Sequence, residues 1–309
     1  MPAYTKFTPT MVLLLFVTFA CVNAQEVSPQ PSWTPPPSRQ AKAPFAPKPL
    51  AGNNIFRGEG EVWLADAVER LSPSRGIDEK AVVEYVALVG NNVAAHSVAP
   101  KKQYQFIVTT EWQPDAMTAG GGRIYISQGM LLKLESEDEL AGVLAHEIAH
   151  DAFAHAAKTV TRQMFWLTGT RKVSTRAAVE AAVNKLLNEY EKKPLATITE
   201  NVLGFSRFDE LEADRAAFYN TYKAGYNPHA LTIVLKRLAR DEENDVGTSE
   251  YRTYQLMMLL FGTHPPTAQR SLALSWEANF VKMPPQNSQF ANPAFTDMKS
   301  RIKALWEHD

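Results

Sequence analysis

Residues 134–150 read Leu-Glu-Ser-Glu-Asp-Glu-Leu-Ala-Gly-Val-Leu-Ala-His-Glu-Ile-Ala-His. Ser136, with Glu139 three residues later, has the pattern of a capping box and predicts that a helix begins here. The three acidic residues of the first turn would lie at the positive end of the helix dipole. Apolar residues then recur at helical spacing, at Leu140, Val143, Leu144 and Ile148. The stretch therefore predicts an amphipathic helix that carries the closing pentapeptide.

The pentapeptide His-Glu-Ile-Ala-His at 146–150 has the spacing of a metal-binding helix. His146 and His150 lie about one helical turn apart and share one face. Both imidazoles can therefore reach one metal ion, and Glu147 can contact a water bound to it. A pair of core histidines bonded to backbone carbonyls is the alternative. It would bury Glu147 without a purpose, so the sequence favours a metal site.

A second predicted helix offers further ligands, because two histidines and a water leave a catalytic zinc one protein ligand short. Residues 206–218 read Ser-Arg-Phe-Asp-Glu-Leu-Glu-Ala-Asp-Arg-Ala-Ala-Phe, and this helix is expected to stop at Gly225. Glu210 and Asp214 are four apart and project from one face. Glu210 can be the third ligand, and Asp214 can accept the free ring N–H of a ligating histidine. Glu212 is expected to be solvated. An ordinary acidic surface helix is the alternative.

Together the motifs His-Glu-x-x-His and Glu-x-x-Ala-Asp resemble the zinc metallopeptidase family that includes HtpX, Oma1 and the CAAX prenyl protease. The chain is most similar to the periplasmic BepA-like members, without their helical-repeat tail. The resemblance runs from about residue 60 to about 275 and also covers Glu139-Leu140-Ala141, His155, Ser206-Arg207, His264-Pro265-Pro266 and Arg270. It implies a gluzincin peptidase with one zinc ion per chain, held by His146, His150 and Glu210. Glu147 would be the general base.

The implied reaction is hydrolysis of a peptide bond by a metal-activated water. Zinc in an open site lowers the pKa of its water to about 7. Glu147 would take the proton as the water attacks a peptide carbonyl, and would pass it to the leaving amine. The family carries a histidine in its His-Pro element, so His264 is the candidate donor to the oxyanion. His264 could instead occupy the open coordination position and hold the enzyme latent, or merely cap a turn.

Two further residues of the resemblance are expected to act structurally. Arg270 could bind substrate or brace the site, and we favour bracing. His155 follows His150 by five residues, which in a continuous helix rotates it away from the metal-facing side. We therefore expect His155 to be a structural hydrogen-bonding residue rather than a ligand.

Residues 119–127, Ala-Gly-Gly-Gly-Arg-Ile-Tyr-Ile-Ser, predict a half-buried strand after a glycine turn. In proteases of the resembled kind, an exposed edge strand can pair with an extended substrate backbone. The expected substrate-binding residues are therefore Gly122, Arg123, Ile124, Tyr125 and Ile126. A phosphate-binding glycine loop is a weaker reading, because neither Lys-Ser/Thr nor a helix follows the glycines. The Asn-Ala-Phe that the family shows before this strand is replaced here by Asp115-Ala116-Met117.

The expected fold is an α+β, mainly helical, zincin-like metalloprotease domain with a small sheet whose edge strand flanks the active site. It would occupy residues 56–309, with helices near 61–71 and 78–95, strands near 104–109 and up to 127, and mainly helices afterwards. The chain of 309 residues has 45% hydrophobic content, enough for a substantial core, and a net charge of −1. This charge argues against nucleic-acid binding.

The first 55 residues predict export. Lys6 precedes an apolar run, from Met11 to Ala20, that suits a signal peptide and is too short to cross a bilayer. We expect signal peptide 1–24 to be cleaved after Ala24 and the protein to be periplasmic, with lipid attachment at Cys21 as the alternative. Cleavage would remove the one cysteine, which suits an oxidising compartment. Residues 25–55 are proline-rich and are expected to form a disordered linker.

Residues 160–190 combine aromatic and basic residues with an amphipathic helix near 178–190. This region could rest on a membrane surface as a peripheral contact, pack its apolar side on the protein, or form a lid over the site. Within the domain, no apolar run approaches the twenty residues that a transmembrane helix needs.

Three functions are compatible with these motifs. The first is an endopeptidase that degrades unfolded or misassembled envelope proteins, where the substrate class follows from the resemblance and the signal peptide. The second is a client-binding, chaperone-like protein of the same fold with little proteolysis. A peptidase with a single natural substrate is the third. The complete set of ligand candidates and general base favours a protease.

Overall fold

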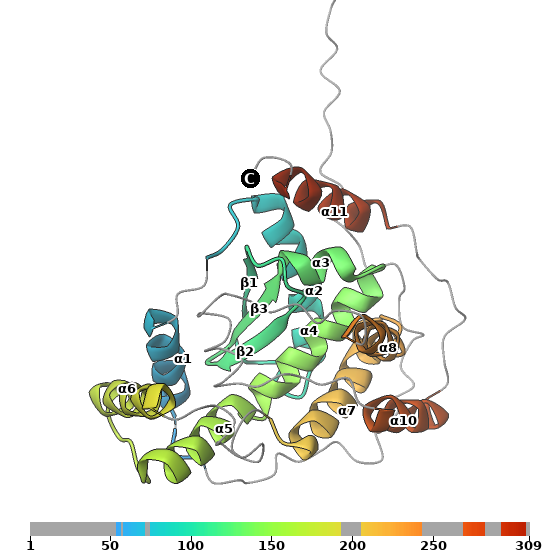
Figure 1. Cartoon of the computed structure of the whole chain (residues 1–309). Helices are drawn as coiled ribbons and strands as arrows, with labels where there is room; N and C mark the ends of the chain where they lie inside the picture. The colour runs from blue at the N-terminus through green and yellow to red at the C-terminus, as the bar shows by residue number, and fades with distance from the viewer. Residues whose placement is uncertain are drawn as a thin grey trace, which may run out of the picture. The chain divides into compact units, whose positions relative to one another are not determined.

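The computed structural model describes residues 54–56, 58–71, 75–192, 205–242, 268–281 and 292–306. These residues form helices around a small sheet, which confirms the expected mainly helical α+β architecture (Figure 1). The helical elements are α1 (Gly60–Leu71), α2 (Lys80–Ala95), α3 (Gln128–Lys133), α4 (Glu137–Ala152), α5 (His155–Gln163), the π-helical turn η1 (Met164–Thr168), α6 (Arg176–Lys192), α7 (Arg207–Ala224), α8 (Ala230–Glu242), α10 (Ala268–Glu277), the 3-10 turn η3 (Ala278–Phe280) and α11 (Pro293–Trp306). The expected signal peptide, nearly all of the proline-rich segment and His264 lie outside the described residues.

The sheet contains three strands in the order β1-β3-β2. Its strands are β1 (Gln105–Thr109), β2 (Ala116–Gly120) and β3 (Arg123–Ser127). Strand β3 pairs in parallel with β1 and antiparallel with β2. Gly121 and Gly122 form the turn between β2 and β3 with positive φ angles of 66° and 81°. Glycine is required at Gly122 for a second reason, since a Cβ there would lie 2.3 Å from the carbonyl oxygen of Gln103.

The strand order corrects one prediction. Residues 122–126 were expected to form the edge that binds substrate, but β3 has a strand on both sides. Within the described part of the chain, the edge on the side of α4 is β2, which lies against that helix. The alternating pattern showed that 123–127 is a strand. It could not show that β1, earlier in the chain, covers the free side of β3.

Helix α4 forms the centre of the domain. It packs against α2, α7, α8 and the sheet, with Leu140, Leu144 and Ile148 fully buried (Figure 1). Gly142 permits the close approach of α8, because a Cβ at this position would lie 3.0 Å from the backbone nitrogen of Leu231. The ligand candidates of the pentapeptide therefore lie on a helix that is held from several directions.

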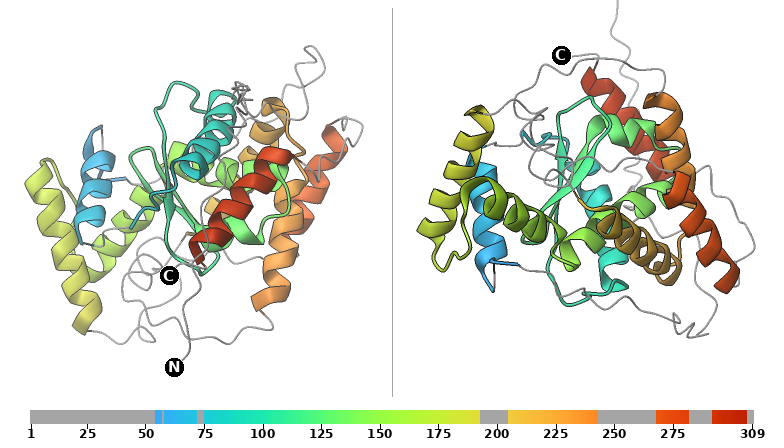
Figure 2. Two further views of the ribbon diagram at one scale, coloured as in Figure 1. Left: turned by 90° about the horizontal axis from the view of Figure 1, so that it is seen from above. Right: turned by 60° about the horizontal axis from the view of Figure 1, so that its bottom comes forward.

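Helix α6 packs its apolar side on the protein, as one of the three readings of residues 160–190 expected. It lies beside α1 in both views of Figure 2, and Val179, Val183 and Leu186 are buried. The aromatic residues Phe165 and Trp166 of η1 are exposed instead. None of the helices in the described ranges combines the length and apolar character that crossing a membrane requires.

Candidate metal centre

The start of α4 is fixed by side chains of its first turn. The hydroxyl of Ser136 accepts a hydrogen bond from the backbone N–H of Glu139 at 3.2 Å. In a complete capping box, the Glu139 carboxylate would accept from the backbone N–H of Ser136. It accepts from the backbone N–H of Glu135 instead, so the predicted box is only half formed. This carboxylate also receives two hydrogen bonds of 2.8 Å from Arg237 of α8. The second half of the box is replaced by a tertiary ion pair, which sequence spacing cannot reveal.

A complete capping box opens α7, the second helix of the site. The Ser206 hydroxyl accepts from the N–H of Asp209, and the Asp209 carboxylate accepts from the N–H of Ser206. The helix ends at Gly225, as predicted, in a left-handed conformation. It lies along α4, and the side chains of Glu210 and Asp214 are buried between the two helices.

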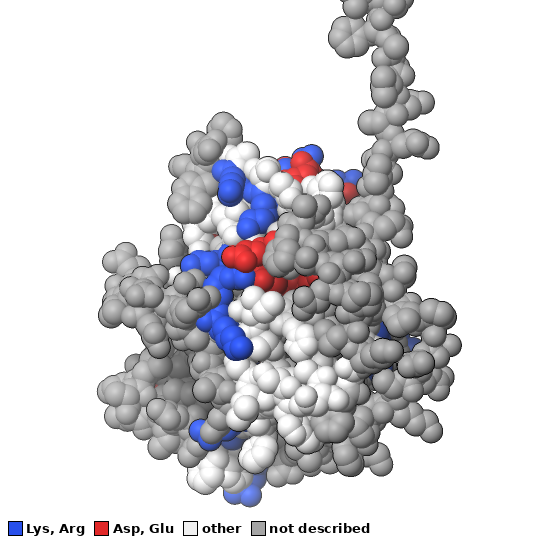
Figure 3. Space-filling model, turned by 90° about the vertical axis from the view of Figure 1, so that its right-hand side faces the viewer, with Lys and Arg blue, Asp and Glu red and all other residues white. Residues whose placement is uncertain are grey.

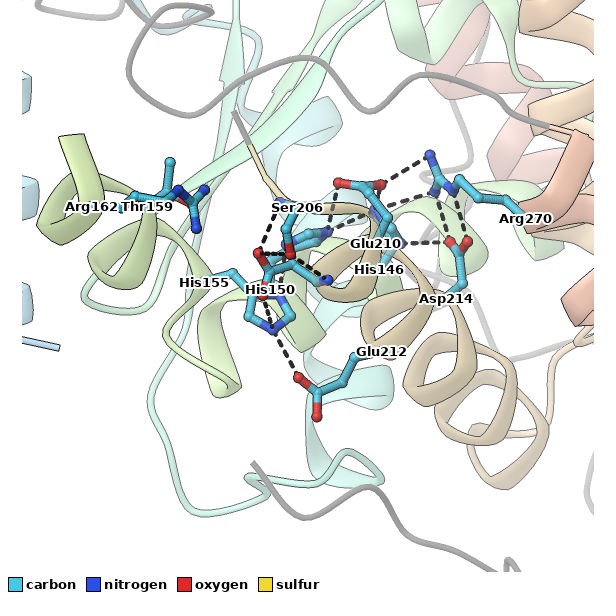
Figure 4. A network of polar contacts seen from close by, with 11 residues as sticks. His146, His150, His155, Thr159, Arg162, Ser206, Glu210, Glu212, Asp214 and Arg270 are labelled. Atoms are coloured by element: carbon cyan, nitrogen blue, oxygen red, sulfur yellow. Dashed lines mark hydrogen bonds and ion pairs between the residues drawn. The ribbon is translucent and has the colours of Figure 1, made fainter. Parts of the chain in front are cut away.

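The three candidate ligands converge on one point (Figure 4). The Nε2 atoms of His146 and His150 are 3.0 Å apart. The Glu210 carboxylate oxygens lie 3.6 Å from each of these nitrogens. Ligand atoms bonded to zinc at about 2.0–2.2 Å in a tetrahedron lie about 3.3–3.5 Å from one another. The measured separations bracket this range, so the residues fit a tetrahedral metal ion with one position left for a non-protein ligand.

The outer side of His146 is held by a buried ion pair. Its Nδ1 lies 3.0 Å from Oδ1 of Asp214, the contact that the spacing of α7 predicted. Arg270 of α10 donates two hydrogen bonds of 2.7 Å to Asp214 and lies 3.0 Å from Oε2 of Glu210 (Figure 4). Arg270 is only 1% exposed. Arg270 therefore braces Glu210, a candidate ligand, and Asp214, the partner of the candidate ligand His146. It cannot reach solvent to bind substrate without moving.

These contacts set the charge of the site. Burial raises the pKa of Asp214, but hydrogen bonds from Arg270 and His146 outweigh burial and hold the pKa below its usual value. Burial lowers the pKa of His146, but hydrogen bonds to Asp214 and Glu210 outweigh it and raise the pKa to about 9. Without a metal, both ring nitrogens of His146 therefore carry a proton at neutral pH, and the imidazole is positively charged. A metal bound at Nε2 would displace the proton of that nitrogen.

The outer side of His150 is held by a second chain of contacts. Its Nδ1 lies 2.9 Å from Nδ1 of His155, and Nε2 of His155 lies 3.0 Å from Oε2 of Glu212 (Figure 4). If each histidine donates outward, toward Glu212, the Nε2 lone pair of His150 is left for a metal. The ring of Phe205 stacks on His150 with centroids 4.2 Å apart.

This second chain of contacts was only partly predictable. His155 is a buried hydrogen-bonding residue, as expected, but it is not rotated away from His150. Helix α4 ends at Ala152, and Ala154 adopts a left-handed conformation that turns the chain back. The prediction that Glu212 is solvated was wrong, because its carboxylate binds His155 and is largely buried. The spacing of Asp209 and Glu212, three residues apart on one face of α7, could have revealed a second acidic partner.

The remaining predicted site residues divide into three groups. Glu147 is 2% exposed and lies beside His146 on α4. The predicted substrate-binding side chains of β3 make other contacts. Arg123 binds Asp66 of α1, and Tyr125 binds Glu69 of the same helix. Ile124 and Ile126 are buried. The N–H of Gly122 donates to the buried carboxylate of Asp151 at 2.9 Å, which attaches the glycine turn to the end of α4. Nothing is described for His264.

The contact between His150 and His155 leads to a testable prediction. Replacing His155 by alanine should weaken metal binding by about 10–100-fold, because the orientation of the His150 ring would no longer be fixed. Competition with a zinc chelator measures this change. The control is His96→Ala, because His96 is exposed at the end of α2. Equal metal affinities in the two variants would contradict a positioning role for His155.

A pair of histidines and a glutamate around one point, with a second glutamate between the histidines in sequence, defines a metal-dependent hydrolase of the zincin class. Comparison with known families agrees. Residues 81–278 match the model of peptidase family M48, which spans more than half of the chain. The chain therefore belongs to peptidase family M48 and is a metalloprotease.

Curated relatives include proteases from bacteria and mitochondria. The chain is 26% identical to the beta-barrel assembly-enhancing protease of Yersinia pestis over 239 residues, 75% of this chain and 46% of the relative. It is 28% identical to the mitochondrial metalloendopeptidase OMA1 of Schizosaccharomyces pombe, over 60% of this chain and 50% of the relative. It is 23% identical to metalloprotease LoiP of Escherichia coli, over 67% of this chain and 73% of the relative. The chain spans about half the length of the first two.

Proposed function

We propose that this protein is a zinc endopeptidase that cleaves unfolded or misassembled proteins of the cell envelope. The observation that carries the proposal is the convergence of His146, His150 and Glu210, whose ligand atoms all lie within 4.8 Å of one another. Two imidazoles and a carboxylate suit one zinc ion. When bound, zinc would polarise the substrate carbonyl and make a water nucleophilic at neutral pH.

The protein side chains would supply proton transfer and orientation. Glu147 would take a proton from the attacking water and return it to the leaving amine. Asp214 and His155 would hold the two imidazoles in the tautomer that leaves each Nε2 free to coordinate. Arg270 would offset the charge of the buried carboxylates Asp214 and Glu210. For His264 we propose one of two roles. It would donate a hydrogen bond to the oxyanion, or it would occupy the open coordination position and hold the enzyme latent.

Substrate would bind along β2 rather than β3. Strand β2 lies beside α4, and its outer side pairs with no other strand in the described part of the chain. An extended peptide can add to such an edge through backbone hydrogen bonds. This mode makes little demand on side chains, which suits substrates defined by being unfolded rather than by sequence.

The envelope location rests on the relatives and on the N-terminal sequence. The relatives from Yersinia pestis and Vibrio cholerae are named for enhancing beta-barrel assembly. Residues 1–24 have the pattern of a signal peptide. Export to the periplasm, with the lipoprotein at Cys21 as the alternative, would place the enzyme among assembling envelope proteins.

Cleavage of matched folded and unfolded substrates tests this function. The zinc-loaded protein should cut an outer-membrane barrel protein that has just been diluted from urea and is still unfolded. It should leave the same barrel protein intact after refolding in detergent. Removing zinc with a chelator should stop cleavage, and adding zinc back should restore it. Protection of the unfolded barrel from aggregation without cleavage would identify a client-binding protein instead and would overturn the proposal.

A further inference from the structure

The turn η1 connects α5 to α6, which Figure 1 labels, and two adjacent aromatic side chains of this turn are exposed to solvent. Phe165 is 40% exposed and Trp166 is 68% exposed, and their rings meet edge to face with centroids 5.4 Å apart. The preceding residue, Met164, is fully buried. The turn is thus anchored at one residue and directs the next two outward.

Hydrogen bonds fix the turn that exposes this pair. The Thr168 hydroxyl donates to the carbonyl of Met164 at 2.7 Å, and the ammonium of Lys185 donates to the carbonyl of Thr168 at 2.8 Å. Gly169 then adopts a left-handed conformation with φ of 72°, which ends the turn. The apolar side of α6, which could have covered the aromatic pair, is already packed on the protein through Val179 and Val183.

The chain segment that contains the pair carries charge of one sign. Residues 152–179 contain five Lys and Arg residues and no Asp or Glu. The guanidinium of Arg171 lies over the ring of Phe165, 4.8 Å from its centroid, and both Arg171 and Lys172 are exposed. Arg176 is different, because it pairs with Asp66 of α1. Two exposed cations therefore adjoin two exposed aromatic rings.

A second exposed apolar pair provides a contrast. Leu272 and Trp276 of α10 are 71% and 59% exposed. Helix α10 lies on the side of the molecule that Figure 3 shows, and the basic and acidic side chains that adjoin one another in this view lie mainly in its upper half. The two pairs are similar in exposure, but the one cation of α10, Arg270, is buried, whereas Arg171 and Lys172 are exposed.

We infer that η1 is a membrane-contact site, in which Phe165 and Trp166 enter the headgroup region of an anionic lipid surface. Tryptophan favours the boundary between headgroups and acyl chains. Arg171 and Lys172 would remain at headgroup level and bind anionic lipids. A pair of rings with two cations gives weak, reversible binding rather than insertion. This inference goes beyond the proposed function and stands whether or not the protein cleaves unfolded chains.

Vesicle co-sedimentation tests the inference on the mature chain beginning at Gln25, the form expected after signal-peptide cleavage. The zinc-loaded protein should bind vesicles of phosphatidylglycerol and phosphatidylethanolamine, and should bind phosphatidylcholine vesicles much more weakly. Binding should fall as salt is raised. The double variant Phe165→Ser/Trp166→Ser should partition about tenfold less well, and Arg171→Gln/Lys172→Gln at least about tenfold less well at low salt.

The matched control is the double variant Leu272→Ser/Trp276→Ser, which removes a comparably exposed pair from a helix whose one cation, Arg270, is buried. It should bind anionic vesicles as the unmodified protein does. Circular dichroism spectra that match the unmodified protein would show that all three double variants are folded. Absence of binding to anionic vesicles, the result expected if η1 instead docks on a protein, would overturn the inference. So would equal losses in the η1 and α10 variants.

Discussion

Glu147→Gln is expected to lower kcat/KM for a peptide substrate by roughly 10²–10⁴-fold, the usual contribution of a general base. Glutamine has the same shape as glutamate but cannot take a proton from water. Glu147 is not one of the three converging side chains, so bound metal should stay at the wild-type level. The loss should therefore appear in turnover and not in metal content.

A matched variant makes this result specific. Glu137→Gln alters another buried glutamate of the same helix, one that accepts a hydrogen bond from Tyr85 at 2.6 Å rather than adjoining the site. It should retain most of the activity. Steady-state cleavage and metal content, measured on both variants, separate loss of the base from damage to α4. Wild-type turnover in Glu147→Gln would contradict the proposed role of Glu147.

Arg270→Met is expected to destabilise the metal-free protein by about 3–5 kcal/mol, the cost of leaving buried charges without their partner. Methionine fills similar space but leaves two buried carboxylates, Asp214 and Glu210, to share one cation, the protonated His146. Urea unfolding of the metal-free protein, monitored by circular dichroism, measures this change. Adding Asp214→Asn to Arg270→Met should recover part of the loss, because one of the two stranded carboxylates is removed.

Arg237 provides the comparison for this second prediction. It also makes two hydrogen bonds to a buried carboxylate, that of Glu139, but its side chain is 15% exposed. Arg237→Met should therefore cost less than Arg270→Met, since water can solvate the charge that remains. A loss of under about 1 kcal/mol for Arg270→Met would contradict the picture of a buried brace.

The sequence predicted those parts of the site that depend on spacing within one helix. His146 and His150 face one point because they are four residues apart, and the same spacing brings Glu210 and Asp214 to one side of α7. Contacts that depend on where the chain turns were not predictable. His155 returns to His150 only because α4 ends and Ala154 turns the chain.

The fold shows the same division between local and tertiary information. Helices α1 and α2 and strand β1 lie where hydrophobic periodicity placed them. The position of β3 between β1 and β2 depends on pairing between separate strands, which alternation within one strand does not encode. The prediction therefore assigned the edge of the sheet to β3, which is its central strand.

Metal analysis of the purified protein tests the central claim, that two helices bring a single zinc site together. Wild-type protein, dialysed against metal-free buffer after zinc loading, should retain one zinc ion per chain. Glu210→Ala removes the ligand that α7 contributes and should retain far less than one. Wild-type protein without bound zinc, or a Glu210→Ala variant that holds zinc as tightly as wild type, would contradict the account.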